Sequence, residues 1–163
     1  MTIEITNHFQ ADVERIYQLL TDTDFLKEQY QTVGARKVEF SRNEQQDGGR
    51  VLEWTREVPT DPPAALSSFF SDWTRTREKI TWTREDEGYR GDYRAELGEE
   101  LHGYVEGQLR LFPDNDGCVE EVFLKAVIQV PVLGKAIAAY AEGHIRDQLD
   151  RERAFVHKRI GET

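Results

Sequence analysis

The hydrophobic and polar positions of this chain change period in a definite order, which predicts both a fold class and a cavity. An alternating segment comes first (Thr2–Phe9), two short helical patterns follow (Ala11–Thr21 and Thr23–Gln31), and a long amphipathic helix closes the chain (Leu133–Arg159). Between them the sequence alternates in six segments separated by turn signals. An antiparallel sheet followed by one long helix must curl around that helix to bury it, which leaves a cavity between them. The pattern predicts an α+β fold with a curved, seven-stranded antiparallel sheet.

Turn residues delimit the six alternating segments. The segments are Arg36–Ser41, Arg50–Val58, Thr74–Arg84, Tyr89–Leu97, Leu101–Phe112 and Val119–Val130. Asp47-Gly48-Gly49 has the composition of a hairpin turn, and Gly98-Glu99-Glu100 predicts another. Pro59–Pro63 contains three prolines, which lack the donors that a strand ladder needs. The apolar segment Ala64–Phe70 that follows is expected to form a helical turn covering the mouth of the sheet.

One predicted inward face contains two glycines. This face, in the segment Leu101–Phe112, comprises Gly103, Val105, Gly107, Leu109 and Leu111. In the next segment the face comprises Val122, Leu124, Ala126, Ile128 and Val130. Glycine inside a strand lowers stability and leaves volume unfilled. Two compatible explanations follow: the glycines let the sheet bend, or they make room for a ligand or for the closing helix.

The closing helix has an apolar stripe and a charged side. The stripe comprises Leu133, Ile137, Tyr140, Ala141, Ile145, Gln148, Leu149 and Phe155. We expect the outer side to carry Glu142, Arg146, Asp150, Arg151 and Arg153. Small residues between Ala136 and Ala141 allow the sheet to approach closely there.

Composition restricts location and partners. The 163 residues fit a single domain spanning positions 1–163. A net charge of −10 repels phosphate backbones and anionic headgroups, so no nucleic-acid partner is expected. No run approaches the roughly 20 apolar residues of a membrane span, so no integral membrane association is expected. A single cysteine, Cys118, and an N-terminus without signal-peptide character favour a soluble cytoplasmic protein. The oligomeric state is left open.

Chemical motifs are sparse. No nucleotide or dinucleotide fingerprint occurs, so no cofactor is expected, and the histidines lack metal-ligand spacing, so no metal is expected. Tyr140, His144 and Gln148 fall on one stripe of the closing helix, where a histidine beside a tyrosine inside a cavity could transfer protons. The alternative is that His144 lies at the helix flank, hydrogen-bonded or solvated. We favour the flank because the sequence places no second acid or base beside it.

The order of elements and the local sequence resemble the helix-grip fold of the START-like (SRPBCC, pollen-allergen-like) superfamily. Phe9 ahead of Ala11-Asp12-Val13, then Leu19-Leu20-Thr21-Asp22 and Phe25, is similar to the opening of bacterial START-like domains. The passage Val130-Pro131-Val132-Leu133-Gly134-Lys135 is similar to their transition from last strand to helix. A Gly-rich hairpin leading to Val58-Pro59 resembles a bacterial subgroup of uncharacterised members. The resemblance covers essentially the whole chain and implies a cavity for hydrophobic or amphipathic ligands. Members include lipid carriers, hormone receptors, polyketide aromatases and cyclases, and regulatory subunits, and the fold does not choose among them.

We therefore predict a binding protein that holds a hydrophobic or amphipathic small molecule, such as a lipid, between sheet and closing helix. The predicted ligand-binding residues are Phe25, Trp54, Trp82, Tyr93, Val105, Leu109, Leu124, Ile137, Tyr140 and Ala141. Two other classes stay open: an aromatase- or cyclase-like enzyme using Tyr140 and His144, and a protein-interaction module with an exposed apolar patch at Ala64–Phe70. Mixed alternation leaves open which of Arg56, Arg77 and Glu78 points inward.

Overall fold

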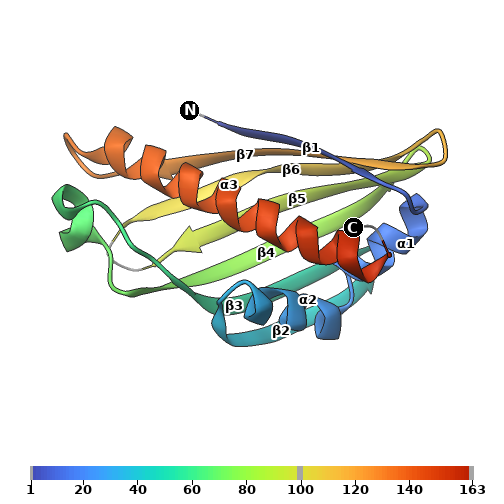
Figure 1. Cartoon of the computed structure of the whole chain (residues 1–163), viewed down its shortest axis with the longest axis horizontal. Helices are drawn as coiled ribbons and strands as arrows, with labels where there is room; N and C mark the ends of the chain where they lie inside the picture. Colours follow the sequence, from blue (N-terminus) through green and yellow to red (C-terminus); the bar gives the residue numbers. More distant parts are fainter. Residues whose placement is uncertain (1, 99–100, 162–163) are drawn as a thin grey trace.

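The computed structural model, which describes residues 2–98 and 101–161, has one curved antiparallel sheet wrapped around a long helix (Figure 1). The strands are β1 (Ile3–Phe9), β2 (Arg36–Gln46), β3 (Gly49–Pro59), β4 (Trp73–Glu85), β5 (Gly88–Leu97), β6 (Gly103–Asp114) and β7 (Gly117–Ile128). The helices are α1 (Val13–Leu20), α2 (Thr23–Thr32), the short 3-10 helix η1 (Ala64–Phe69) and α3 (Gly134–Arg159). The predicted helix-grip fold is confirmed.

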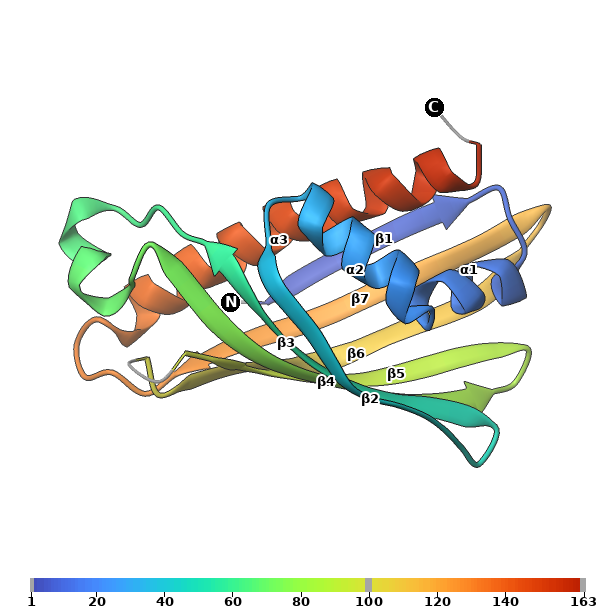
Figure 2. The ribbon, with the colours of Figure 1, turned by 90° about the horizontal axis from the view of Figure 1, so that it is seen from below.

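The sheet is a meander whose two ends are far apart in sequence. Its strand order is β1-β7-β6-β5-β4-β3-β2, with every neighbouring pair antiparallel. Figure 2 shows α1, α2 and α3 on one face of the curved sheet. Asp12 and Asp22 cap α1 and α2, each accepting hydrogen bonds from backbone amides of the first turn. The two capped helices pack on the sheet, where α1 contacts β5, β6 and β7 and α2 contacts β2.

Several predicted boundaries are shifted by short distances. The second strand continues past Ser41 to Gln46, because its polar residues still pair with β3 up to the turn at Asp47 and Gly48. Pro59 is the last residue of β3 rather than part of the excluded segment, since it lies opposite Trp73 on β4. The turn predicted at residues 98–100 lies partly outside the described residues.

The glycines of β6 lie where β7 approaches closely, and neither leaves room for a ligand. A Cβ atom at Gly107 would lie 1.8 Å from the carbonyl oxygen of Phe123, on the adjacent β7. At Gly103 it would lie 2.5 Å from the Cδ1 atom of Ile128. The absent side chains therefore allow a close approach of β7 and leave no space for a ligand at these positions.

The charged side of α3 departs from the prediction at two positions. Glu142 and Arg153 are buried, being 3% and 7% exposed, whereas the pattern placed them outward. The helix is covered from more than one direction, because it contacts β7, β1 and α2. Arg153 consequently reaches Glu120 on β7, and one Glu142 oxygen accepts a hydrogen bond of 3.4 Å from the amide of Ala126. The solvent-facing side of α3 is therefore narrower than the charged side that the sequence pattern predicts.

Candidate functional site

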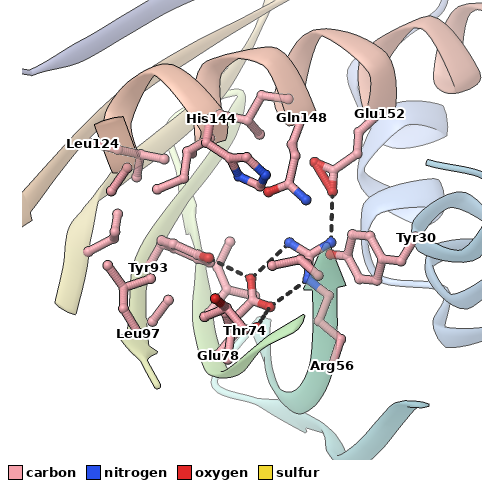
Figure 3. Close-up of a pocket in the computed structure, with 18 of the residues that line it drawn as sticks. Tyr30, Arg56, Thr74, Glu78, Tyr93, Leu97, Leu124, His144, Gln148 and Glu152 are labelled. Atoms are coloured by element: carbon pink, nitrogen blue, oxygen red, sulfur yellow. Dashed lines mark hydrogen bonds and ion pairs between the residues drawn. The ribbon is translucent and has the colours of Figure 1, made fainter. Parts of the chain in front are cut away.

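A cavity of about 120 Å³ lies between the sheet and α3 (Figure 3). Its walls come from α2, from β3 to β7 and from α3. Leucine, isoleucine and valine side chains of the central strands supply much of the lining, as at Ile80, Val105 and Leu109. Apolar cavities of about 150 Å³ hold one benzene-sized molecule, so this cavity suits a ring or a short chain.

The structure brings eight of the ten predicted site residues to this cavity. They are Trp54, Trp82, Tyr93, Val105, Leu109, Leu124, Tyr140 and Ala141. Phe25 and Ile137 are buried but do not line it. Phe25 instead packs against the ring of Phe155, with 5.4 Å between ring centroids. Both residues belong to the packing that holds the helices on the sheet.

One end of the cavity carries a buried polar cluster. Arg56 and Glu78 both point inward and form a bidentate pair, with Nε–Oε2 and Nη2–Oε1 distances of 2.7 and 3.2 Å. Arg77, between the inward positions of β4, is exposed. The guanidinium of Arg56 also lies over the ring of Tyr30, 4.0 Å from its centroid.

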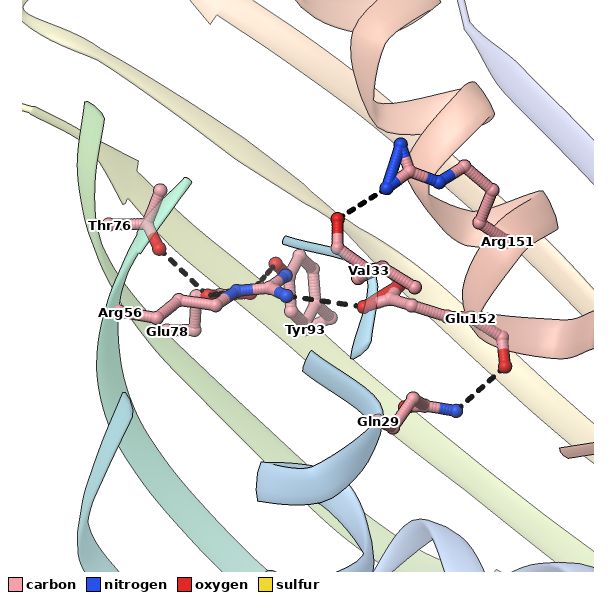
Figure 4. A network of polar contacts seen from close by, with 8 residues as sticks. All are labelled: Gln29, Val33, Arg56, Thr76, Glu78, Tyr93, Arg151 and Glu152. Carbon is pink, nitrogen blue, oxygen red and sulfur yellow. Dashed lines mark hydrogen bonds and ion pairs between the residues drawn. The ribbon is translucent and has the colours of Figure 1, made fainter. Parts of the chain in front are cut away.

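The carboxylate of Glu78 accepts four hydrogen bonds. Besides Arg56, it accepts a 2.5 Å bond from the Tyr93 hydroxyl and a 2.8 Å bond from the Thr76 hydroxyl (Figure 4). Burial raises the pKa of Glu78, but the charge and hydrogen bonds of Arg56 outweigh it, and the pKa lies below its usual range. Burial and the negative charge of Glu78 raise the pKa of Tyr93 well above its usual range. The pair is therefore a carboxylate beside a neutral phenol.

A second carboxylate reaches the cluster from α3. Glu152 Oε1 lies 3.2 Å from Nη1 of Arg56, so one arginine joins two acids from different elements. Burial raises the pKa of Glu152, and the arginines offset only part of this effect. The amide of Gln29 on α2 donates a 2.8 Å bond to the Glu152 carbonyl oxygen and fixes the helix at this point. Figures 3 and 4 show Glu152 directed toward Arg56.

A second buried ion pair lies beside this cluster. Arg153 binds Glu120 of β7 through two bonds of 2.6 and 2.7 Å. Asn7 donates a further bond of 2.9 Å to the same carboxylate. Arg153 also lines the cavity, but its charge is matched by Glu120. This pair ties the C-terminal half of α3 to the sheet.

Tyr140 and His144 also line the cavity, from positions of α3 that precede Glu152. His144 Nε2 donates a 2.9 Å bond to the carbonyl oxygen of Pro59, and the Tyr140 hydroxyl accepts a 3.1 Å bond from the amide of Asp61. Both residues, with Thr60, line the interior cavity and also a hollow on the outer surface. We call these two hydrogen bonds the α3 latch. They join the helix to the last residue of β3 and to the segment that follows it.

Two indole donors in the lining have no acceptor. Trp54 and Trp82 are 4% and 2% exposed, and their Nε1 atoms have no hydrogen-bond partner among the described residues. An unpaired buried donor carries a desolvation cost of about 1–3 kcal/mol. An oxygen of a ligand or of water beside either nitrogen would remove this cost.

Sequence reasoning missed Glu152 and left Arg56 and Glu78 unresolved. The signal at Glu78 is its place in the alternation Thr76, Glu78, Ile80, Trp82, where a charged residue interrupts an inward face. Glu152 had no such signal, because it lies within the charged run Asp150–Arg153. Only the three-dimensional structure places it opposite Arg56.

Within residues 2–98 and 101–161, no helix is both long and apolar enough to cross a membrane. The same residues include no cluster of three or more histidine, cysteine or acidic side chains arranged to hold a metal.

Comparisons with known proteins identify a family and a fold. The model of a family described as "Protein of unknown function (DUF2505)" matches residues 4–160. A search of curated proteins gives no match. Protein TTHA0849 from Thermus thermophilus is similar in structure, with 16% identity, a TM-score of 0.65 and coverage of 96% of this chain and 97% of that chain. The Zhui aromatase/cyclase from Streptomyces sp. R1128 has 14% identity, a TM-score of 0.61 and coverage of 100% and 99%. At these identities the likeness concerns the fold alone.

Proposed function

Since this chain belongs to the DUF2505 family, whose description states no function, we propose from its own cavity that it binds a small amphipathic molecule between the sheet and α3. The observation that carries this proposal is an apolar cavity with a polar cluster at one end and two indole donors that lack acceptors among the described residues. Small-molecule sites combine these features: an apolar lining and a few fixed polar groups. The resemblance of the sequence to the START-like superfamily agrees with this function. The eight predicted residues that line the cavity are the proposed ligand contacts.

The proposal is tested by native mass spectrometry of the purified protein, followed by organic extraction and identification of what is released. The natural protein is compared with the cavity-filling variant Ala95→Leu, because Ala95 is buried in the cavity lining and a larger side chain there fills the space. We expect a small molecule to co-purify with the natural protein and to be depleted in the variant. Failure to recover any molecule, together with failure of the cavity to take up an apolar fluorescent dye, would contradict the proposal.

An aromatase- or cyclase-like enzyme is the second candidate, because titratable groups line the same cavity. Tyr140 and His144 both lie in the lining, as this candidate requires, and the elevated pKa of Glu152 adds a group able to exchange protons. A structural neighbour is itself an aromatase/cyclase. The recovered ligand distinguishes the two functions: a binder returns it unchanged after prolonged incubation, and an enzyme converts it.

The interaction-module alternative has less support. It required an exposed apolar patch at Ala64–Phe70, but Leu66 is only 6% exposed and Phe69 and Phe70 are half-buried. Phe70 packs edge-on against Tyr140, with 5.0 Å between ring centroids. Phe70 therefore forms part of the cavity lining, and the large apolar side chains of this segment form no fully exposed patch.

A further inference from the structure

The buried charges of this protein do not balance. In the described part of the chain, the carboxylates of Glu78, Glu120, Glu142 and Glu152 are all less than 5% exposed, whereas only two guanidinium groups, those of Arg56 and Arg153, are buried. A buried charge without a partner is costly, so it is neutralised by a proton or by an opposite charge. A positively charged ligand could therefore neutralise part of this surplus of negative charge.

The ion-pair partners of the buried acids place part of the excess negative charge at Glu152. Arg153 and Glu120 compensate each other through two short bonds, and Arg56 is bound in bidentate fashion by Glu78. Glu152 shares only the remaining nitrogen of Arg56, at 3.2 Å. Of the acids that line the cavity, Glu78 has four donors and Glu152 is the one left undercompensated.

The surroundings of Glu152 suit an organic cation. Trp54, Trp82 and Tyr93 all line the cavity, and aromatic faces attract cations through their quadrupoles, whereas the guanidinium of Arg56 already lies over the ring of Tyr30. The indole nitrogens of the two tryptophans have no hydrogen-bond partner among the described residues, so an acceptor oxygen of a ligand or of water could bind them. A cation and a ring-sized apolar body are thus matched by an acid and an apolar lining in one cavity.

We propose that the ligand is a small amphipathic amine, whose protonated nitrogen pairs with Glu152 and whose apolar body lies against the central strands. This inference rests on the proposed binding function and adds the class of ligand. A carboxylate ligand of the same size is disfavoured, because it would add a third negative charge next to Glu78 and Glu152. A neutral alcohol fits the apolar lining but leaves Glu152 without its partner.

Three probes of equal bulk test the charge of the ligand: 2-phenylethylamine, 2-phenylethanol and phenylacetate. Binding is measured by isothermal titration calorimetry near pH 8, where nearly all of the amine is protonated and a carboxylate is ionised. We expect the amine to bind at least about tenfold more tightly than the alcohol, and phenylacetate to bind more weakly than both. Equal or weaker binding of the amine would overturn the inference but leave the binding function intact if the alcohol binds. No binding of any probe would contradict the binding function as well.

Glu152→Gln tests the residue. Glutamine keeps the shape of the side chain and an oxygen that accepts from Arg56, so the fold is expected to persist, as a nitrogen–proton NMR spectrum checks. We expect this variant to bind 2-phenylethanol as the natural protein does and to lose the preference for the amine. Asp150→Asn is the matched control, because Asp150 is an exposed acid on the same helix, and its preference is expected to be unchanged. Preference for the amine that survives in Glu152→Gln would refute the assignment.

Discussion

Arg56 and Glu78 face each other diagonally across two neighbouring strands and form a bidentate ion pair inside the cavity. In the register of β3 and β4, Arg56 lies opposite Thr76 and Glu78 lies opposite Trp54. The 2.7 Å bond from Nε to Oε2 leaves Nη1 free to reach Glu152 on α3. One arginine therefore organises the polar end of the cavity and connects the sheet to the closing helix.

Removal of Arg56 is expected to destabilise the protein strongly. Arg56→Met leaves two buried acids without their common partner, and breaking a buried pair in this way costs about 3–5 kcal/mol. The measurement is the free energy of unfolding in urea. Arg94→Met is the matched control, because the ion-pair partners of Arg94, Glu96 and Glu106, are both exposed, and its loss is expected to cost about 1 kcal/mol or less. An equal decrease in the free energy of unfolding in the two variants would show that the buried cluster stabilises the fold no more than an exposed ion pair does.

Glu152→Gln is expected to change the pH dependence of stability. A carboxyl group whose pKa is raised by folding favours the folded state at low pH, and this contribution is lost as the pH rises through the folded pKa. The groups that face Glu152 are Arg56, Glu78, Tyr30 and Arg153, and they remain in the variant. We expect the variant to gain stability relative to the natural protein as the pH rises above the usual glutamate pKa of about 4.3. Urea unfolding at a series of pH values checks this, and a difference that is constant or that shrinks with pH would contradict it.

Trp82→Ala is expected to reduce both stability and ligand retention. Trp82 is 2% exposed and lines the cavity, so truncation costs about 3–5 kcal/mol and removes part of the binding wall. Trp73→Ala is the control, because Trp73 is half-buried and lies outside the cavity lining. Thermal unfolding and native mass spectrometry measure the two effects. Retention of ligand in Trp82→Ala comparable to that in the control would exclude Trp82 from the binding wall.

The variant His144→Ala distinguishes a role of His144 in holding the ligand, through the α3 latch, from a role in catalysis. His144 is partly exposed and makes one hydrogen bond with Pro59, so we expect a loss of stability of about 1 kcal/mol and ligand dissociation faster by roughly fivefold. Stopped-flow displacement of a bound fluorescent ligand measures the rate. Tyr140→Phe, which removes the second bond of the α3 latch, is expected to act in the same direction. Conversion of a ligand that falls by about 10²–10⁴-fold in His144→Ala would instead support the enzyme.

The architecture could be predicted from the sequence because burial imposes a period of two on strands and 3.6 on helices. Val105, Leu109 and Leu111 are apolar residues at even spacings along β6, so their inward face was correctly identified. The polar cluster was not predicted, because its members come from three elements whose register is a tertiary property. Mixed alternation left open whether Arg56 or Glu78 points inward, and Glu152 is one acid in a charged helical run. The same reason explains Glu142 and Arg153, whose burial depends on contacts of α3 with β7 and not on helical period.

The most direct test of binding inside the cavity is an isotope-filtered NOE experiment with 2-phenylethanol and methyl-labelled protein. This neutral probe tests the cavity independently of the charge of the ligand. Val105 and Leu124 are buried in the cavity wall, and Val132, which is 99% exposed, supplies a control methyl group. We predict NOEs from the ring protons of the probe to the methyl groups of Val105 and Leu124, and none to Val132. At saturating probe, NOEs confined to surface methyl groups, or none at all, would contradict the account.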